Sequence, residues 1–362
     1  MRGEPRRKHR RPGDDAIAFV DAAPVAIPQG IPGYNDVSRA SGDTSSISMS
    51  SPQNDFGREI SDAIVSFTPG ALGREPVYRD ALVASFRQEG NYRAARIVAG
   101  IAVDSHGALE ERAVDGLLIR AHCEIQRVSE EFLHGERVAQ LLLPVIESLR
   151  AAGASRPIRV VDIGCGTGYV LRWLASRGAV GADVELIGAD FNPALVAAAT
   201  ALAEEESLAC RFLVADAFVL DEPAAIFLST GVLHHFRGAS LASFFAQHAG
   251  PETRAFLHFD FQPSVIAGVG AWVFHVLRMR EPLSRHDGVL SAQRVHSAET
   301  LMTAAEAAGP DFCTAIFGAR LWRLPIPRVF HTLAGVRPEL REPLLERLGP
   351  RMASRLGEWR LP

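Results

Sequence analysis

The feature that most constrains this 362-residue chain is a strand-like run that leads directly into three alternating glycines. The run, residues 159–163, is mostly β-branched and apolar, which is typical of a buried parallel strand. Gly164, Gly166 and Gly168 follow, and residues 169–175 then read as a helix. A strand, a glycine-rich turn and a helix bring backbone N–H groups close to a nucleoside-type ligand, so the turn predicts such a ligand in an α/β fold.

The spacing of the glycines separates two kinds of ligand. A dinucleotide site favours G-x-G-x-x-G, because the pyrophosphate must sit on the helix N-terminus. The spacing here is G-x-G-x-G, and Asp162 stands two residues before the first glycine. A carboxylate at that place would repel a pyrophosphate but would suit an ammonium group. S-adenosylmethionine (SAM) carries an amino-acid end and no phosphate, and residues 161–168 resemble the first motif of the class I SAM-dependent methyltransferases.

Polar residues at successive strand ends are suited to different parts of SAM. Asp190 follows the second expected strand and offers two acceptor oxygens to the ribose hydroxyls, while Asp216 follows the third and can accept from the adenine amino group. The matching positions of the family do these jobs, so the resemblance implies a cofactor site with no metal. Its expected residues are Asp162, Gly164, Cys165, Gly166, Gly168, Asp190, Phe191, Asp216, Ala217, Phe218 and Thr230.

Strands alternating with helices after residue 153 predict a parallel, doubly wound sheet, and the resemblance implies seven strands. The last two strands are expected at 312–317 and 319–324, and an apolar segment at 263–277 reads as a buried helix. Residues 61–152 show helical periodicity and predict a cap over the substrate, or alternatively a support or homodimer surface. Residues 1–60 are rich in Pro, Gly and Ser, which predicts a disordered tail. We interpret the basic residues at its start as a solvated end of the chain.

Composition excludes several classes of partner. The formal net charge is −4, and the first twelve residues contribute +5, from six basic side chains and one acidic one. The rest of the chain therefore carries a net charge of −9, which disfavours binding to the negatively charged backbone of nucleic acid. The four cysteines are scattered without metal-ligand spacing, which fits reduced thiols in a cytoplasm. No run reaches the roughly 18–20 apolar residues of a membrane span.

Two adjacent histidines, His234 and His235, follow the fourth expected strand. Histidine titrates near neutral pH and can remove the proton of an acceptor. We expect one of the two to be that base, with His235 favoured because it matches the more regular position in the resembling families. Further on, Asp287 and Arg294 belong to an Asp-Gly-x-x-Ser-x-x-Arg run and are expected to pair with each other.

Together these observations predict a SAM-dependent methyltransferase that acts on a small, largely apolar acceptor, at oxygen, as in secondary metabolism. Three alternatives stay open from the residues alone. One is an enzyme of the same fold that uses SAM without methyl transfer, such as a cyclase or decarboxylase. The others are a non-catalytic SAM-binding protein and a nicotinamide-dependent oxidoreductase, which the glycine spacing disfavours.

Overall fold

The structure is a computed structural model that describes residues 57–67, 73–309, 311–320 and 328–362. Most of the expected tail, residues 1–56, lies outside the described residues. The described part is one compact unit. Glu59 and Ile60, which the sequence analysis assigned to the tail, are buried in it.

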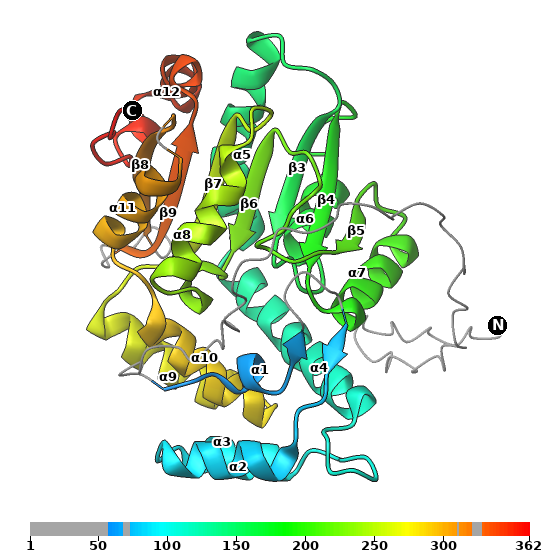
Figure 1. Ribbon diagram of the computed structural model, residues 1–362. Helices are drawn as coiled ribbons and strands as arrows, with labels where there is room; N and C mark the ends of the chain where they lie inside the picture. The colour runs from blue at the N-terminus through cyan, green and yellow to red at the C-terminus, as the bar shows by residue number, and fades with distance from the viewer. Residues whose placement is uncertain (1–56, 68–72, 310, 321–327) are drawn as a thin grey trace, which may run out of the picture. The chain divides into compact units, whose positions relative to one another are not determined.

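A seven-stranded sheet organises the described residues, in the order β5-β4-β3-β6-β7-β9-β8 (Figure 1). The pairs from β5 to β7 are parallel, whereas β9 is antiparallel to both of its neighbours. The mostly parallel sheet expected from the sequence is therefore confirmed. The strands are β3 (Ile158–Ile163), β4 (Val184–Asp190), β5 (Arg211–Val214), β6 (Ile226–Thr230), β7 (Ala255–Phe261), β8 (Cys313–Arg320) and β9 (Arg328–Val336).

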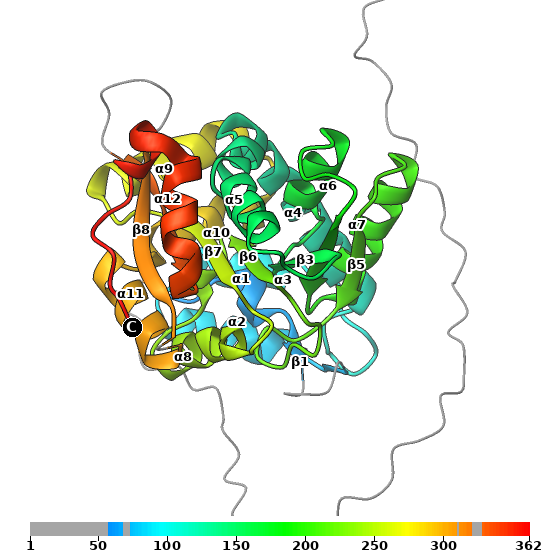
Figure 2. The ribbon, with the colours of Figure 1, turned by 90° about the horizontal axis from the view of Figure 1, so that it is seen from above.

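Helices cover both faces of this sheet. One face packs against α5 (His134–Ala151), α6 (Tyr169–Ser176) and α12 (Pro338–Ala353), which Figure 2 shows side by side. The opposite face packs against α8 (Ala239–Ala246) and α11 (Ala298–Ala308). Helix α7 (Pro193–Glu205) begins at the N-cap Asn192, whose side chain accepts a hydrogen bond from Ala194 N at 2.9 Å.

A second hydrophobic core joins the N-terminal elements to α10 (Pro282–Arg294). These elements lie below the sheet in the view of Figure 1. Their apolar residues recur at helical spacing and bury one stripe each, as an amphipathic helix does. They are the helices α1 (Ile60–Ala63), α2 (Arg79–Gln88), α3 (Tyr92–Ala99) and α4 (Glu111–Glu131). Between α1 and α2 the chain forms an antiparallel pair of short strands, β1 (Ser66–Phe67) and β2 (Arg74–Glu75).

The expected cap at 61–152 is therefore divided between two cores. Helix α5 packs on the sheet, because Val138, Leu141, Leu142 and Leu149 point into the sheet core. Within the expected cap, the helices that precede α5 belong to the second core. Periodicity gives the apolar face of a helix but not the surface that this face meets.

Two other expectations need correction. The second C-terminal strand is β9 at 328–336, whereas residues 319–320 belong to β8 and 321–324 lie outside the described residues. Helix α9 (Val265–Arg278) is not fully buried, contrary to the expectation from the sequence. Helix α10 packs along only one side of it, and its outer face stays exposed. The exposed large side chains of α9 are Val269, Trp272, Val273, Val276 and Leu277.

No helix among the described residues is long and apolar enough to cross a membrane.

Candidate functional site

The turn after β3 has the backbone that its glycines allow. Gly164, Gly166 and Gly168 have φ values of +68°, +55° and +74°, a left-handed region that strains other residues. A Cβ on Gly166 would lie 2.6 Å from His122 Cδ2 on α4, so this helix closes over the turn. The turn therefore needs glycine for its conformation and for the approach of α4.

Asp162 lies at the end of β3 with its side chain buried, at 3% exposure. Its Oδ1 has no hydrogen-bond partner among the described residues. Burial, with a smaller contribution from the charge of Asp190, raises the pKa of Asp162 to about 8. An unpaired, buried carboxyl oxygen is costly, and a ligand ammonium would satisfy it.

Asp190, at the end of β4, connects two turns. Its Oδ2 accepts a hydrogen bond from Gly166 N at 2.9 Å, and its Oδ1 accepts one from Asn192 N at 2.9 Å. Each oxygen keeps a second lone pair, so both remain able to accept from ribose hydroxyls. Burial raises the pKa of this carboxyl group, while the two backbone N–H groups and nearby His122 oppose the shift.

The remaining expected cofactor residues surround the same edge of the sheet. Phe191 is 47% exposed, and its ring meets Phe67 of β1 edge to face with centroids 5.2 Å apart. Asp216 accepts a hydrogen bond from Phe218 N at 2.9 Å and so closes the turn that holds Ala217. Cys165 packs its sulfur against β4, where a Cβ on Gly188 would lie 2.8 Å away.

A small cavity of about 20 Å³ lies at the carboxyl ends of β6 and β7. Among its lining residues are Thr230, Gly231, Asp260, Phe330 and His134. The hydroxyl of Thr230 is buried without a partner among the described residues. Burial lowers the pKa of His134 to about 4, so this imidazole is neutral at pH 7. An aromatic wall continues from Phe330 through the rings of Phe132, Phe261 and Phe274.

His234 and His235 lie on the single turn η1 (Leu233–His235), with ring centroids 4.4 Å apart. The Nδ1 of buried His234 lies 3.1 Å from Asp260 Oδ2, and its backbone N also donates to this oxygen at 3.2 Å. Asp260 therefore fixes the ring of His234. Burial alone would raise the pKa of the Asp260 carboxyl, but the nearby His234 holds this pKa below its usual value. Nε2 is the ring nitrogen that Asp260 leaves free.

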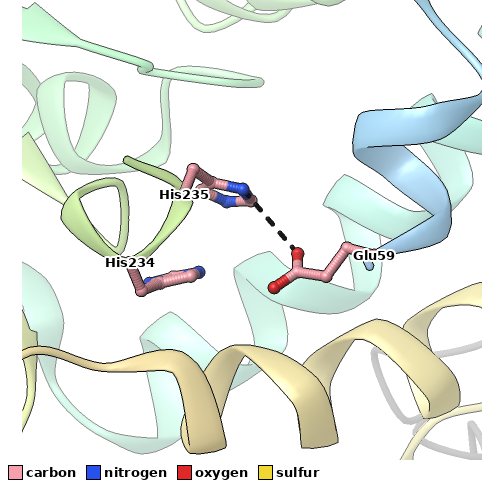
Figure 3. A group of neighbouring side chains, drawn as sticks. All are labelled: Glu59, His234 and His235. Atoms are coloured by element: carbon pink, nitrogen blue, oxygen red, sulfur yellow. Dashed lines mark ion pairs between the residues drawn. The ribbon is translucent and has the colours of Figure 1, made fainter. Parts of the chain in front are cut away.

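His235 has different neighbours. Its Nδ1 lies 2.9 Å from Asp62 Oδ1 and 3.8 Å from Glu59 Oε2, and Figure 3 shows Glu59 directed between the two histidines. Although burial opposes it, the attraction of Asp62 and Glu59 raises the pKa of His235 to about 10. The ring is consequently protonated at pH 7 and lacks the lone pair that a base needs, which favours His234 over His235 for that role.

Arg294 and Asp287 do not pair with each other, contrary to expectation. Arg294 Nη1 instead lies 3.2 Å from Glu59 Oε1 and 3.1 Å from Asp62 Oδ2. Asp287 accepts hydrogen bonds from Ile60 N at 2.9 Å and Ser61 N at 2.8 Å. Both residues thus hold α1 against α10, and the correction follows from their common neighbours in the N-terminal segment.

Sequence reasoning missed four residues of this region: Glu59, Asp62, His122 and His134. Glu59 and Asp62 stand about 170 residues before the histidines, at the edge of a segment expected to be disordered. His122 and His134 sit in helical patterns that carry no motif. Only the tertiary packing of α1, α4 and α5 brings these side chains to the site.

Comparison with known proteins agrees with the cofactor side of this arrangement. Residues 160–250 match a family model described as a methyltransferase domain, and this stretch contains the glycine turn, Asp190, Asp216 and both histidines. A demethylmenaquinone methyltransferase of Thermus thermophilus is 41% identical over 81 residues, which are 22% of this chain and 36% of that protein. A mitochondrial citrate synthase-lysine N-methyltransferase of Pongo abelii is 38% identical over 73 residues, 20% of this chain and 28% of that protein.

The chain thus spans about a third of the length of these two relatives. Among solved structures, a magnesium protoporphyrin IX methyltransferase of Synechocystis PCC 6803 is 17% identical, with 72% of this chain and 99% of that one covered at a TM-score of 0.39. The family match, the strand order and the unpaired carboxyl of Asp162 beside the glycine turn agree. Residues 160–250, about a quarter of the chain, are therefore similar to a methyltransferase domain.

Proposed function

We propose that this protein transfers the methyl group of SAM to an oxygen atom of a small, largely apolar acceptor. The observation that carries the proposal is Asp162, whose buried carboxyl has an unpaired oxygen at the end of β3 beside the glycine turn. The ammonium group of SAM would satisfy that oxygen and favour the ionised carboxylate. When bound, SAM supplies an electrophilic methyl group on its sulfonium.

The order of the strands supports a placement for the other end of the cofactor. Ligands of open α/β sheets lie outside the carboxyl ends of the strands, and Asp190 and Asp216 follow β3 along that edge in the direction of β5. Asp190 would accept from the ribose, and the exposed ring of Phe191 would pack on adenine. The methyl group would then point the other way, towards Thr230 on β6.

The acceptor would lie beyond Thr230. The cavity there is bounded by Phe330 and neutral His134, and an aromatic wall favours a flat, largely apolar molecule. His234 and His235 follow the same strand and would act on the reacting oxygen. Bringing the oxygen in line with the methyl group is the main requirement, since proximity alone can supply several kcal/mol, about 7 or more.

The test uses methyl-labelled SAM and extract of the producing cell, separated into a small-molecule and a protein fraction. We expect label in the small-molecule fraction, attached to oxygen in the purified product by mass spectrometry and NMR. Asp162→Asn should abolish labelling, and Asp221→Asn, an exposed carboxyl outside the site, should not. Label found only in the protein fraction would contradict the acceptor class, and SAM binding without transfer to either fraction would contradict the reaction.

A further inference from the structure

We propose that Glu59, His234 and His235, with Asp62 beside them, bind one divalent metal ion, which holds the acceptor oxygen for methylation. One nitrogen or oxygen atom from each of Glu59, His234 and His235 lies within 4.8 Å of the corresponding atoms of the other two. Figure 3 shows the Glu59 carboxylate, carried by the N-terminal segment, facing both imidazoles. This inference rests on the proposed function and adds a cofactor to it.

Arg294 binds one oxygen of the Glu59 carboxylate and one oxygen of the Asp62 carboxylate. Its Nη1 lies 3.2 Å from Glu59 Oε1 and 3.1 Å from Asp62 Oδ2, and Ser291 Oγ also donates to Glu59 Oε1 at 3.1 Å. The other two oxygens, Glu59 Oε2 and Asp62 Oδ1, lie 3.8 and 2.9 Å from His235 Nδ1. Each carboxylate is therefore held by one oxygen and presents the other towards the histidines.

His234 is held in the same way. Asp260 accepts from its Nδ1, which leaves Nε2 as the available ligand atom. A histidine that binds metal through one nitrogen almost always donates the other N–H to a carboxylate or carbonyl group, which fixes the ring and strengthens the ligand. Asp260 occupies that supporting position in this structure.

The distances suit a metal ion with small adjustments. Ligand bonds of about 2.0–2.2 Å place neighbouring donor atoms roughly 3–4 Å apart. The proton on His235 Nδ1 now lies between this nitrogen and Asp62 Oδ1, and the ion would take its place. Two imidazoles with carboxylates form a donor set typical of Zn²⁺, Mn²⁺ or Fe²⁺.

The ion would replace the proton of His235. Without that proton, the carboxylates of Glu59, Asp62 and Asp260 exceed the nearby guanidinium groups of Arg294 and Arg237 by one negative charge. A divalent ion would leave one positive charge, which an acceptor oxyanion would neutralise. Glu59 is 1% exposed and His234 4%, so these charges are only weakly screened by water.

The ion would acidify the acceptor hydroxyl that it binds, and the hydroxyl proton would pass to bulk water. The oxygen would then form a bond to the methyl carbon as the carbon–sulfur bond breaks. That electron pair stays on sulfur, and S-adenosylhomocysteine leaves as a neutral thioether. In this arrangement His234 serves as a ligand, and no imidazole needs to accept the proton.

The experiment uses the full chain, stripped of metal with a chelator and titrated with Zn²⁺ by calorimetry. We expect one ion per chain, and at least about tenfold weaker binding in Glu59→Gln and in His235→Ala, whereas His106→Ala, an exposed histidine elsewhere, binds like the wild type. Calorimetry with S-adenosylhomocysteine reports whether each variant is folded.

A second measurement needs no variant. X-ray absorption of the Zn²⁺-loaded wild type should show two imidazoles and oxygen ligands. Absence of stoichiometric binding, absorption without imidazole, or unchanged binding in folded Glu59→Gln would each overturn the metal site. Methyl transfer that persists in the stripped protein would refute this inference and leave the proposed function intact, whereas metal binding without SAM binding would refute the proposed function alone.

Discussion

The Asp260 carboxylate at the end of β7 accepts from both the ring Nδ1 of His234, at 3.1 Å, and its backbone N, at 3.2 Å. One buried side chain therefore sets the ring orientation and the path of the turn after β6. Asp260 lies on β7 and His234 on the turn η1 that follows β6, and these two strands are paired in register, with Thr230 opposite Phe259. The free nitrogen of His234 is thus positioned by the sheet itself.

Replacing Asp260 should therefore affect the acceptor side of the reaction. We expect Asp260→Asn to lower the turnover number roughly 10- to 100-fold, the usual effect of removing a partner that orients a ligand or a base. SAM affinity, measured by calorimetry, should stay at the wild-type value, because the hydrogen bonds that Asp260 accepts come from His234 and from the backbone of Phe261. Asp311→Asn, an exposed carboxyl, is the control; a loss of SAM affinity equal to the loss of turnover would contradict this division.

The raised pKa of Asp162, about 8, predicts how stability changes with pH. In the unfolded chain this group titrates near about 3.9, so between about pH 4 and 8 the folded, ligand-free protein holds a proton that the unfolded chain has lost. The free energy of unfolding should therefore decrease as pH rises through this range. Asp162→Asn should reduce that slope while it weakens SAM binding.

The measurement is chemical denaturation of the ligand-free protein at several values from about pH 5 to pH 8. Asp221→Asn should keep the wild-type slope, because this carboxyl is exposed. An identical slope in Asp162→Asn and wild type would mean that Asp162 is ionised in the ligand-free protein.

Asp190 has both a structural and a binding role. Asp190→Asn keeps one acceptor oxygen but presents an NH₂ group to one of the two backbone N–H donors, from Gly166 and Asn192. We expect SAM affinity to fall roughly 10- to 100-fold, from the loss of a charge-assisted bond worth about 1.5–3 kcal/mol, with a lower melting temperature. Calorimetry and thermal unfolding measure the two effects; unchanged affinity would remove Asp190 from the ribose site.

Two truncations should separate the tail from the site. Removal of residues 1–56 leaves the contacts among the described residues of the site in place, so SAM binding and turnover should match the full chain. Removal of residues 1–63 also takes Glu59, Asp62 and the buried Ile60, and we expect turnover to fall at least about tenfold. Both proteins are compared by SAM calorimetry and initial rates, and equal turnover in the two would show that the N-terminal segment is not part of the acceptor site.

The two halves of the site differ in how far local sequence predicts them. The cofactor half consists of residues at consecutive strand ends, and a parallel sheet brings such residues to one edge whatever the loops do. The strand pattern alone therefore places Asp162, Gly166 and Asp190 together. The same rule places Phe191, but its partner Phe67 lies on a strand of two residues that carries no recognisable pattern.

The acceptor half depends on contacts between distant segments. His234 and His235 are adjacent, and the local sequence does not distinguish their roles. In the structure, however, His234 is hydrogen-bonded to Asp260 and His235 to Asp62. The preference for His235 as a base depends on its position in a motif, whereas the charges that surround it come from α1, more than 170 residues away. Only the folded chain determines which acidic side chains surround each imidazole.

By itself the sequence determined the class of fold, the mostly parallel sheet and the class of cofactor, because these follow from local periodicity, from glycines that permit left-handed turns, and from carboxyl groups at strand ends. The tertiary structure alone decided that α5 belongs to the sheet, that α9 keeps an open face, and that Glu59 and Asp62 join the two histidines. Packing partners and electrostatic neighbours are set by distances in space, which spacing along the chain does not encode.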